Sequence, residues 1–336
     1  MKAARLKSLK NLEVVEMDKP ELQAGEVLVR VKSGGICGTD MHIFAKENAF
    51  SHHLGHELSG EVVENRSEEY DFKQGDRVVI DNATNCGVCK FCKNGQLEYC
   101  SDIRNLLMEE RLSFQEYVAV PARSLYKFED LSFQAAALAE PFTVALEMIA
   151  TAEVEAGQDI AVFGPGPIGL MAAAYARHIG VNKIYLTGRS HSKKRLELGR
   201  KIGVDEIIEV DQEDTVEFFK ERNLKLDRVL ITAPPYTIKD AVQILRFGGI
   251  LTYIGFSFDG RENVELNFND IHLNKLQIRA THAIPNRFFP AALENIKKGV
   301  INAEDFISRE FMLADVQKAF EFTLDNETIK TLINID

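Results

Sequence analysis

The feature that most constrains how this chain can fold is an alternation of apolar strands and amphipathic helices that begins at Asp159. The strand-like segments DIAVF, KIYLTG, EIIEV and RVLITA alternate with helix-like segments such as IGLMAAAYARHIG and KKRLELGRKIG, and a helix near residues 238–246 precedes a further strand that starts at Ile250. Strands and helices that alternate in this way form a parallel sheet whose strands are joined by crossover helices. The sequence therefore predicts an α/β fold with a doubly wound parallel sheet in this part of the chain.

A glycine-rich turn, GPGPIG, joins the first of these strands to the first helix. It contains Gly164, Gly166, Pro167, Ile168 and Gly169. Between a strand and a helix, the first glycine allows a tight turn, the second lets a pyrophosphate approach the backbone, and the third lets the helix pack against the strand. The helix N-terminus adds free N–H groups and a positive dipole end for the phosphates. A turn between unrelated elements is the alternative, but the strands and helices that follow favour a Rossmann cofactor domain.

The end of the second strand indicates which dinucleotide binds. An acidic residue about 20 residues beyond the glycines binds the ribose 2′-hydroxyl of NAD. The segment KIYLTGRSHSKKR has no acid there and offers Gly188, Arg189, Ser190, Lys193, Lys194 and Arg195. Arg189 can bind a 2′-phosphate through two nitrogens and Ser190 adds a neutral donor, whereas a carboxylate in place of Gly188 would repel it. We therefore expect NADP, bound through Gly188, Arg189, Ser190 and Lys193; alternatively, the lysines only solvate the start of a helix.

The first 125 residues or so have a different pattern, with short alternating strands at Glu26–Val31, Glu61–Val63, Arg77–Ile80 and Glu116–Val120. A helical period follows in residues 131–152, interrupted by Pro141. A chain of 336 residues is long enough for two domains. We expect a catalytic domain at 1–146 with a metal lobe at 86–100, a cofactor domain at 147–281, and a C-terminal segment at 282–336 that returns to the first domain.

Charge and hydropathy narrow the class of partner. A net charge of −11 argues against general nucleic-acid binding, because phosphate contacts need an excess of Lys and Arg on at least one face. No apolar run approaches the roughly 20 residues that span a bilayer, and the first residues have no apolar signal core. We expect a cytoplasmic protein that acts on a small molecule, with no nucleic acid and no membrane partner.

Four of the five cysteines form the pattern CxxCxxCx7C, at Cys86, Cys89, Cys92 and Cys100. Four thiolates from one loop can complete a tetrahedral shell, which leaves no position for a substrate, so the pattern predicts a structural zinc site. The alternatives are an iron–sulfur cluster, a nucleic-acid zinc ribbon, which the negative charge disfavours, and four buried thiols without metal.

A second metal site is predicted around the remaining cysteine, Cys37 in GGICGTDMH, with His56 and Glu57 in LGHELSG. A catalytic zinc ion takes about three protein ligands and keeps one open position. Cys37 and His56 can supply two of them, and Glu140 in LAEPF is the best candidate for the third. Each residue alone is weak evidence, since a lone cysteine is usually a small core residue and a helical glutamate is usually solvated.

Together these segments resemble the zinc-containing medium-chain dehydrogenase/reductase family, from GICGTDMH and GHELSGEVV through GDRV, the four cysteines and GPGPIG. The resemblance implies a GroES-like β-rich catalytic domain beside the Rossmann domain, and a homodimer or homotetramer. It makes Cys37 and His56 catalytic zinc ligands, Glu57 a neighbouring acid that can ligate or support the metal, and Glu140 the third ligand. Alcohol dehydrogenases of the liver and yeast type have Cys at this last position, whereas sorbitol, threonine and sugar-alcohol dehydrogenases have Glu followed by Pro. Glu140-Pro141 therefore indicates the polyol group.

By the same resemblance Thr39 and His42 match the proton-relay positions of the family. Zinc would act as a Lewis acid on the substrate oxygen, Thr39 would pass the hydroxyl proton toward His42, and a hydride would move between the carbinol carbon and the nicotinamide. The alternative for His42 is a polar residue on an exposed turn.

The resemblance implies reversible oxidation of a secondary alcohol or polyol to its ketone or ketose. Two alternatives stay open: an NAD-dependent enzyme similar to threonine dehydrogenase, and a non-catalytic nucleotide-binding relative, which the complete metal and relay positions disfavour. The chain departs from the family pattern in the short stretch between Asp40 and His56, in RLSFQEY at Arg111–Tyr117, and in the missing ribose-binding acid. The first two lie where substrate loops are expected, so the resemblance does not assign the substrate.

Overall fold

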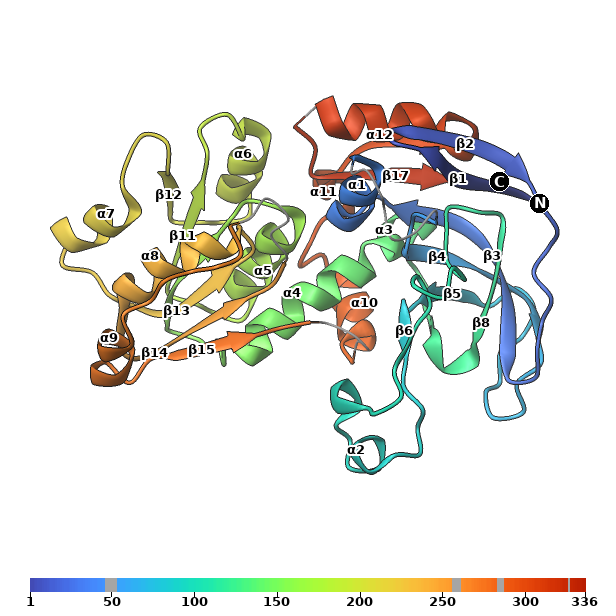
Figure 1. The fold of residues 1–336 in the computed structure, drawn as a ribbon, viewed down its shortest axis with the longest axis horizontal. Coiled ribbons are helices and arrows are strands. Elements are labelled where there is room, and N and C mark those ends of the chain that lie inside the picture. The colour runs from blue at the N-terminus through green and yellow to red at the C-terminus, as the bar shows by residue number, and fades with distance from the viewer. Residues whose placement is uncertain (46–52, 256–260, 283–286, 326) are drawn as a thin grey trace. The chain divides into compact units, whose positions relative to one another are not determined.

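The computed structural model describes residues 1–336 except 46–52, 256–260, 283–286 and 326. Residues 46–52, within the short stretch between Asp40 and His56, thus lie outside the described residues. Contacts between residues divide the chain into two compact units, Met1–Thr143 with Ala283–Asp336, and Val144–His282. Figure 1 shows both units as ribbons, coloured from blue at the N-terminus to red at the C-terminus.

The first unit is built on a seven-stranded sheet, counted over the described residues, in which β8 pairs with β3 beside the path β16-β17-β3-β4-β5-β9. Its pairs are antiparallel except β16 with β17, and two separate two-stranded sheets, β1-β2 and β6-β7, are also antiparallel. The strands of this unit are β1 (Lys2–Ser8), β2 (Asn11–Glu16), β3 (Glu26–Gly35), β4 (Glu57–Asn65), β5 (Arg77–Ile80), β6 (Ala83–Thr84), β7 (Arg104–Asn105), β8 (Tyr117–Pro121), β9 (Leu125–Lys127), β16 (Ile307–Met312) and β17 (Lys330–Asn334).

Strand β3 is the centre of this unit. It is buried over nearly its whole length because β4 pairs along one side while β8 and β17 share the other. The C-terminal strand β17 runs antiparallel to β3, with Leu332 opposite Gly35. The C-terminal segment therefore lies against the strand that leads to Cys37.

Helices complete the core of the first unit. They are α1 (Gly38–Ala45), α2 (Lys90–Lys93), α3 (Phe133–Ala137), the start of α4 (Ala139–Thr151), α10 (Phe289–Lys297), α11 (Ala303–Phe306) and α12 (Val316–Asp325). Phe320 of α12 packs its ring 5.1 Å from that of Phe44 and 6.1 Å from that of Phe114, measured between centroids. All three rings are fully buried, so α12 fixes α1 against the sheet.

The second unit has six parallel strands in the order β12-β11-β10-β13-β14-β15 within the described residues. This is the strand order 3-2-1-4-5-6 of a Rossmann domain, and the order reverses beside β10. Its elements are β10 (Asp159–Phe163), α5 (Pro167–His178), β11 (Lys183–Gly188), α6 (Lys193–Lys201), β12 (Glu206–Glu209), α7 (Thr215–Glu221), β13 (Leu226–Ile231), α8 (Ile238–Ile244), β14 (Leu245–Tyr253), α9 (Phe268–Leu273) and β15 (Gln277–Ala280).

One helical stretch corrects an expectation from the sequence. Among the described residues, Phe133–Thr151 is long and apolar enough to cross a membrane by length and composition, although we expected no such run. The stretch is interrupted near Pro141, as expected: α3 ends at Ala137 and α4 begins at Ala139, with Pro141 in the first turn of α4, where a proline is tolerated. Most of the stretch is buried inside the protein, which is also what a core helix shows.

Candidate functional site

Pairing of β3 with β4 brings the segments of the expected catalytic metal site together. Gly35 lies opposite Glu57 in the register, so Cys37 and His56 flank the same end of the strand pair. The Sγ of Cys37, a ring nitrogen of His56 and a carboxylate oxygen of Glu57 all lie within 4.8 Å of one another. His56 and Glu57 are buried, whereas Cys37 is only partly buried. The cluster is therefore accessible from the side of Cys37.

Asp40, which is fully buried, organises this cluster. Its carboxylate accepts hydrogen bonds from the backbone N–H of Cys37 and of Gly55, both at 2.9 Å. Its Oδ1 lies 3.5 Å from Nδ1 of His56, which leaves Nε2 as the ligand atom. Burial lowers the pKa of His56, but the neighbouring Asp40 and Cys37 outweigh it and raise the pKa well above its usual value. A metal ion at this site has to displace that proton.

Glu57 forms a buried ion pair with Lys330 of β17. The two side chains are only 1% and 3% exposed, and Nζ of Lys330 lies 2.7 Å from Oε1 of Glu57. The same ammonium group donates to the carbonyl oxygen of Ile36 at 3.1 Å. The second oxygen of Glu57, Oε2, is buried and has no hydrogen-bond partner among the described residues. A buried carboxylate oxygen without a donor beside a thiol and an imidazole fits a bound cation, so the residues present fit zinc.

Glu140, in the first turn of α4, lies beside the cluster. It is buried, and its Oε1 accepts a hydrogen bond from Nδ2 of Asn82 at 3.0 Å. Burial raises the pKa of Glu140 to about 7; the charge of His56 lowers the pKa and that of Glu57 raises it. Glu140 is therefore electrostatically linked to the cluster, although it is not among the three residues whose ligand atoms lie within 4.8 Å.

The two expected relay residues lie on α1, directly after Cys37. Thr39 is exposed near the start of the helix, and His42 is partly buried three residues later. Residues three apart in a helix share a face, so both side chains lie on the same side of α1.

The four-cysteine lobe has the geometry of a closed metal shell. Four sulfurs about 2.3 Å from a zinc ion lie roughly 3.8 Å apart at the corners of a tetrahedron. The Sγ–Sγ distances are 3.6 Å for Cys89–Cys92, 3.9 Å for Cys89–Cys100 and 3.6 Å for Cys86–Cys100. Backbone N–H groups of Cys92 and Ser101 lower the pKa of the Cys89 thiol to about 5, while burial and the neighbouring thiols raise that of Cys92 to about 12. The sulfurs are thus arranged for a metal whose binding would displace the remaining protons.

In the second unit, the glycine loop leads from β10 into α5 at the point where the strand order reverses. Pro167 is the first residue of α5 and Gly166 its N-cap. A Cβ on Gly169 would lie 2.2 Å from the carbonyl oxygen of Gly164, so only glycine fits there. The free N–H groups at the start of α5 therefore lie at the crevice where dinucleotides bind in Rossmann sheets.

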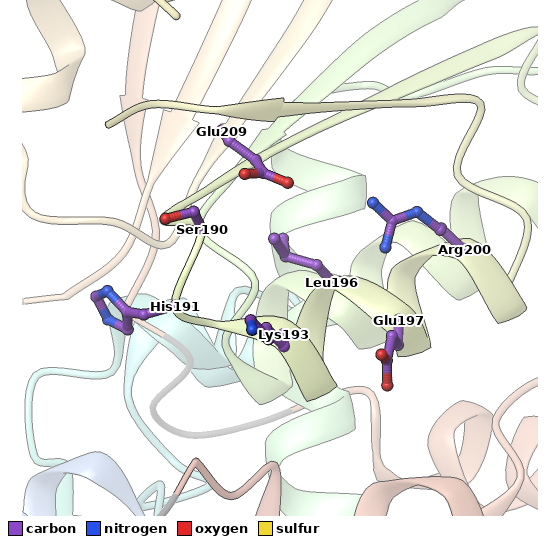
Figure 2. A pocket seen from close by; sticks show the side chains of 7 residues that line it. All are labelled: Ser190, His191, Lys193, Leu196, Glu197, Arg200 and Glu209. Carbon is purple, nitrogen blue, oxygen red and sulfur yellow. The ribbon is translucent and has the colours of Figure 1, made fainter. Parts of the chain in front are cut away.

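A cavity of about 430 Å³ opens next to this region, beside α6. Figure 2 shows the side chains that line it, from α6, from the loop after β11 and from β12: Ser190, His191, Lys193, Leu196, Glu197, Arg200 and Glu209. Two expected cofactor residues, Ser190 and Lys193, thus line one cavity. Gly188 is buried, and a Cβ there would lie 2.8 Å from the side chain of Leu196 and 2.9 Å from that of Pro165, so a larger residue would require these side chains to shift.

The surroundings of Ser190 differ from our expectation. Its backbone N–H and its hydroxyl both donate to the carboxylate of Asp211, at 2.7 and 2.5 Å. A hydroxyl has one proton, so in this structure Ser190 has no donor left for a phosphate. The side chains of Arg189 and Lys193 form no ion pair or hydrogen bond with any residue the structure describes, and are available to an anion.

Four residues of the two sites were not identified from the sequence: Asp40, Asn82, Lys330 and Asp211. The role of Asp40 could have been found from nearby residues. It lies between Cys37 and His42, and acidic residues are favoured in the first turn of a helix. Lys330 and Asp211 had no such nearby signal, because they are far along the chain from Glu57 and Ser190.

Comparisons with known proteins agree with this arrangement. The family model described as "Alcohol dehydrogenase GroES-like domain" matches residues 23–130, and the model "Zinc-binding dehydrogenase" matches residues 167–298. The chain is 30% identical to the sorbitol dehydrogenase of Bacillus subtilis (strain 168), over 99% of this chain and 97% of the relative.

Two solved structures share the fold over nearly their full length. An alcohol dehydrogenase from E. coli CFT073, complexed with NADH, has a TM-score of 0.89 and 27% identity over 99% of both chains. A protein described as a zinc-binding dehydrogenase from Sinorhizobium meliloti 1021, bound to NADP, has a TM-score of 0.86 and 26% identity over 99% of this chain and 98% of that one. Relatives therefore use either nicotinamide cofactor. By its two domain matches and its full-length similarity to a sorbitol dehydrogenase, this chain belongs to the zinc-dependent medium-chain dehydrogenase/reductase family, in the group similar to polyol and threonine dehydrogenases.

Proposed function

We propose that this protein is a zinc-dependent oxidoreductase that interconverts a secondary alcohol or polyol and its ketone or ketose with NADP(H). The observation that carries the proposal is the convergence of Cys37, His56 and Glu57 at one end of the β3–β4 pair. A thiolate, an imidazole and a carboxylate are ligand types that zinc takes in catalytic sites with one open position. The partial exposure of Cys37 leaves a route for a substrate.

Each residue of the first unit has a role in this proposal. Cys37 and His56 hold the metal, and Glu57 or Glu140 supplies the third ligand. Zinc bound there provides a Lewis acid for the substrate oxygen. Asp40 orients the imidazole, and Lys330 holds Oε1 of Glu57, while Oε2 has no hydrogen-bond partner among the described residues.

The proton of the substrate hydroxyl leaves by way of α1. Thr39, at the exposed start of the helix, would accept the proton on its hydroxyl oxygen while its own hydroxyl proton moves toward His42, which lies one turn later on the same face and would pass a proton to solvent. The order of the two residues along α1 gives the proton a short path away from the cluster.

The proposed cofactor preference rests on the second unit. The dinucleotide binds at the glycine loop, with its pyrophosphate at the N-terminus of α5. Arg189 and Lys193 supply positive charge for a 2′-phosphate, and Gly188 leaves no side chain in its way. Ser190 lines the cavity but does not donate to the phosphate.

The test is a turnover assay on a panel of secondary alcohols, polyols and ketoses, with both cofactors and with threonine as a separate substrate. We expect activity with polyols or ketoses, faster with NADP(H), and two zinc ions per chain by elemental analysis. The variant Cys37→Ser should lose one zinc ion and the activity but keep the zinc of the four-cysteine lobe. Activity with threonine and NAD alone would favour the amino-alcohol enzyme, and full activity of Cys37→Ser would exclude the proposed metal site.

We also propose a cytoplasmic homodimer or homotetramer, on the basis of the family resemblance. Light scattering of the purified protein should give two or four times the chain mass of 37.8 kDa. A monomer at micromolar concentration would contradict this part of the proposal.

A further inference from the structure

A carboxylate lies next to the expected 2′-phosphate position although the second strand ends without an acid. Asp211 belongs to the turn after β12, and the backbone N–H of Val210 before it bonds to the carbonyl oxygen of Gly188 at 3.0 Å. This bond holds the turn beside the end of β11, and Asp211 then accepts both hydrogen bonds from Ser190. The turn after the third strand thus places a carboxylate at the end of the second strand, where the sequence of β11 has none.

The position of this carboxylate matters because of where the ribose lies in a Rossmann domain. The 2′ group of the adenosine ribose meets the end of the second strand and the residues directly after it, which here are Gly188, Arg189 and Ser190. Asp211 contacts Ser190 through both carboxylate oxygens, and it is exposed. A 2′-phosphate that approaches Arg189 therefore also approaches a negative charge.

Side chains of both charge signs line the cavity. His191, Lys193 and Arg200 are basic, and Glu197 and Glu209 are acidic. The hydrogen bonds from Ser190 lower the pKa of Asp211, so the carboxylate is ionised throughout the physiological pH range. It cannot become a neutral donor to the phosphate at neutral pH.

We propose that Asp211 is a specificity-determining residue of the cofactor site, which opposes the 2′-phosphate and limits the preference for NADP(H) that Arg189 and Lys193 create. The inference rests on the proposed function, because it assumes that a dinucleotide binds at the glycine loop. It predicts that the natural protein binds both NAD(H) and NADP(H). The difference between the two affinities should be smaller than it would be in a site that has Arg189 and Lys193 but no carboxylate.

The test measures binding, so that it does not depend on turnover. Isothermal titration of the purified zinc-loaded protein with NADP⁺ and with NAD⁺ gives two dissociation constants, for the natural protein and for Asp211→Asn. The substitution removes the charge but keeps an oxygen that can accept from Ser190. The matched control is Glu221→Gln, which removes one exposed negative charge at the end of α7, away from the cavity.

For Asp211→Asn we expect NADP⁺ to bind about tenfold more tightly at low salt, with NAD⁺ changed by less than about twofold; a tenfold change corresponds to about 1.4 kcal/mol. The gain should shrink as salt is raised from 0.01 to 0.5 M, because screening weakens a charge effect. Glu221→Gln should change neither constant. Ser190→Ala, which keeps the carboxylate, should not reproduce the gain.

Other outcomes overturn the inference. Unchanged NADP⁺ affinity in Asp211→Asn shows that the carboxylate does not sense the phosphate, and equal losses for both cofactors show that Asp211 only orders the loop. A loss confined to NAD⁺ shows that Asp211 binds the ribose hydroxyl instead. If the natural protein binds neither cofactor, the proposed function fails together with the inference, whereas binding of both without an effect of Asp211→Asn leaves the proposed function intact.

Discussion

Replacement of Lys330 by methionine should destabilise the first unit strongly. Lys330 and Glu57 are almost completely buried, 2.7 Å apart, and they join the C-terminal strand β17 to β4. Methionine fills most of the same volume but provides no charge. Glu57 would then be a buried carboxylate without a counter-charge, and the carbonyl oxygen of Ile36 would lose its side-chain donor.

The expected size of the effect follows from this burial. Removing one partner of a buried pair costs about 3–5 kcal/mol, because the other charge stays buried without compensation. The exposed pair Lys318–Asp315 provides the matched control, since its side chains are 72% and 43% exposed. Lys318→Met should lose less than about 1 kcal/mol. In the double variant Lys330→Met/Glu57→Gln the orphaned charge is absent, so we expect recovery of more than half of the loss.

The assay is urea unfolding of the natural protein and of each variant, with zinc and after chelation. Bound zinc provides positive charge near Glu57, so the loss in Lys330→Met should be larger in the chelated protein. A loss below about 1 kcal/mol in chelated Lys330→Met, or no recovery in the double variant, would refute the reasoning that the ion pair stabilises this end of the sheet.

Three further outcomes can be checked. The pKa of Glu140 is raised from 4.5 to about 7 in the folded protein, so the folded state holds the extra proton between these values and stability falls as pH rises through that window. The chelated variant Glu140→Gln should therefore lose this pH dependence, and its free energy of unfolding at pH 8 should exceed that of the natural protein by up to about 3 kcal/mol. If the substitution leaves the dependence of stability on pH unchanged between pH 4.5 and 8, Glu140 is not the group with the raised pKa. Cys92→Ser should leave one zinc ion per chain and make residues 86–100 sensitive to limited proteolysis, whereas two retained zinc ions would show that the lobe does not bind the metal. Arg189→Gln should weaken NADP⁺ binding by about 10- to 100-fold with little change for NAD⁺, and an equal loss for both would place Arg189 away from the 2′-phosphate.

Local patterns were sufficient to predict much of the fold. The strand–turn–helix context of GPGPIG predicted the Rossmann sheet, which the strand order confirms. The four cysteines lie within 15 residues, so their spacing alone predicted a shell that the sulfur distances fit. The expected strand Arg77–Ile80 agrees with β5, because its β-branched residues Val78, Val79 and Ile80 are typical of strands. From the sequence we expected domain limits at residues 146 and 281. Contacts between residues divide the chain into its two units after Thr143 and after His282.

The rest depended on contacts between distant segments. Lys330 could not be assigned to the metal cluster because only the pairing of β17 with β3 brings it there. Asp211 was overlooked because only the end of the second strand was considered for acidic residues, whereas Asp211 reaches Ser190 from the turn after the third strand. Strands β1 and β2 were not predicted because their buried positions alternate only in part with exposed ones.

The most direct test of the proposed active site is anomalous diffraction at the zinc edge from crystals of the protein grown with NADP⁺. Two peaks per chain are expected. One should lie inside the four-cysteine lobe, and the other about 2.3 Å from the Sγ of Cys37 and about 2.1 Å from a ring nitrogen of His56, with the nicotinamide ring facing it. A single peak in the lobe, with no metal between Cys37 and His56, would contradict the dehydrogenase mechanism.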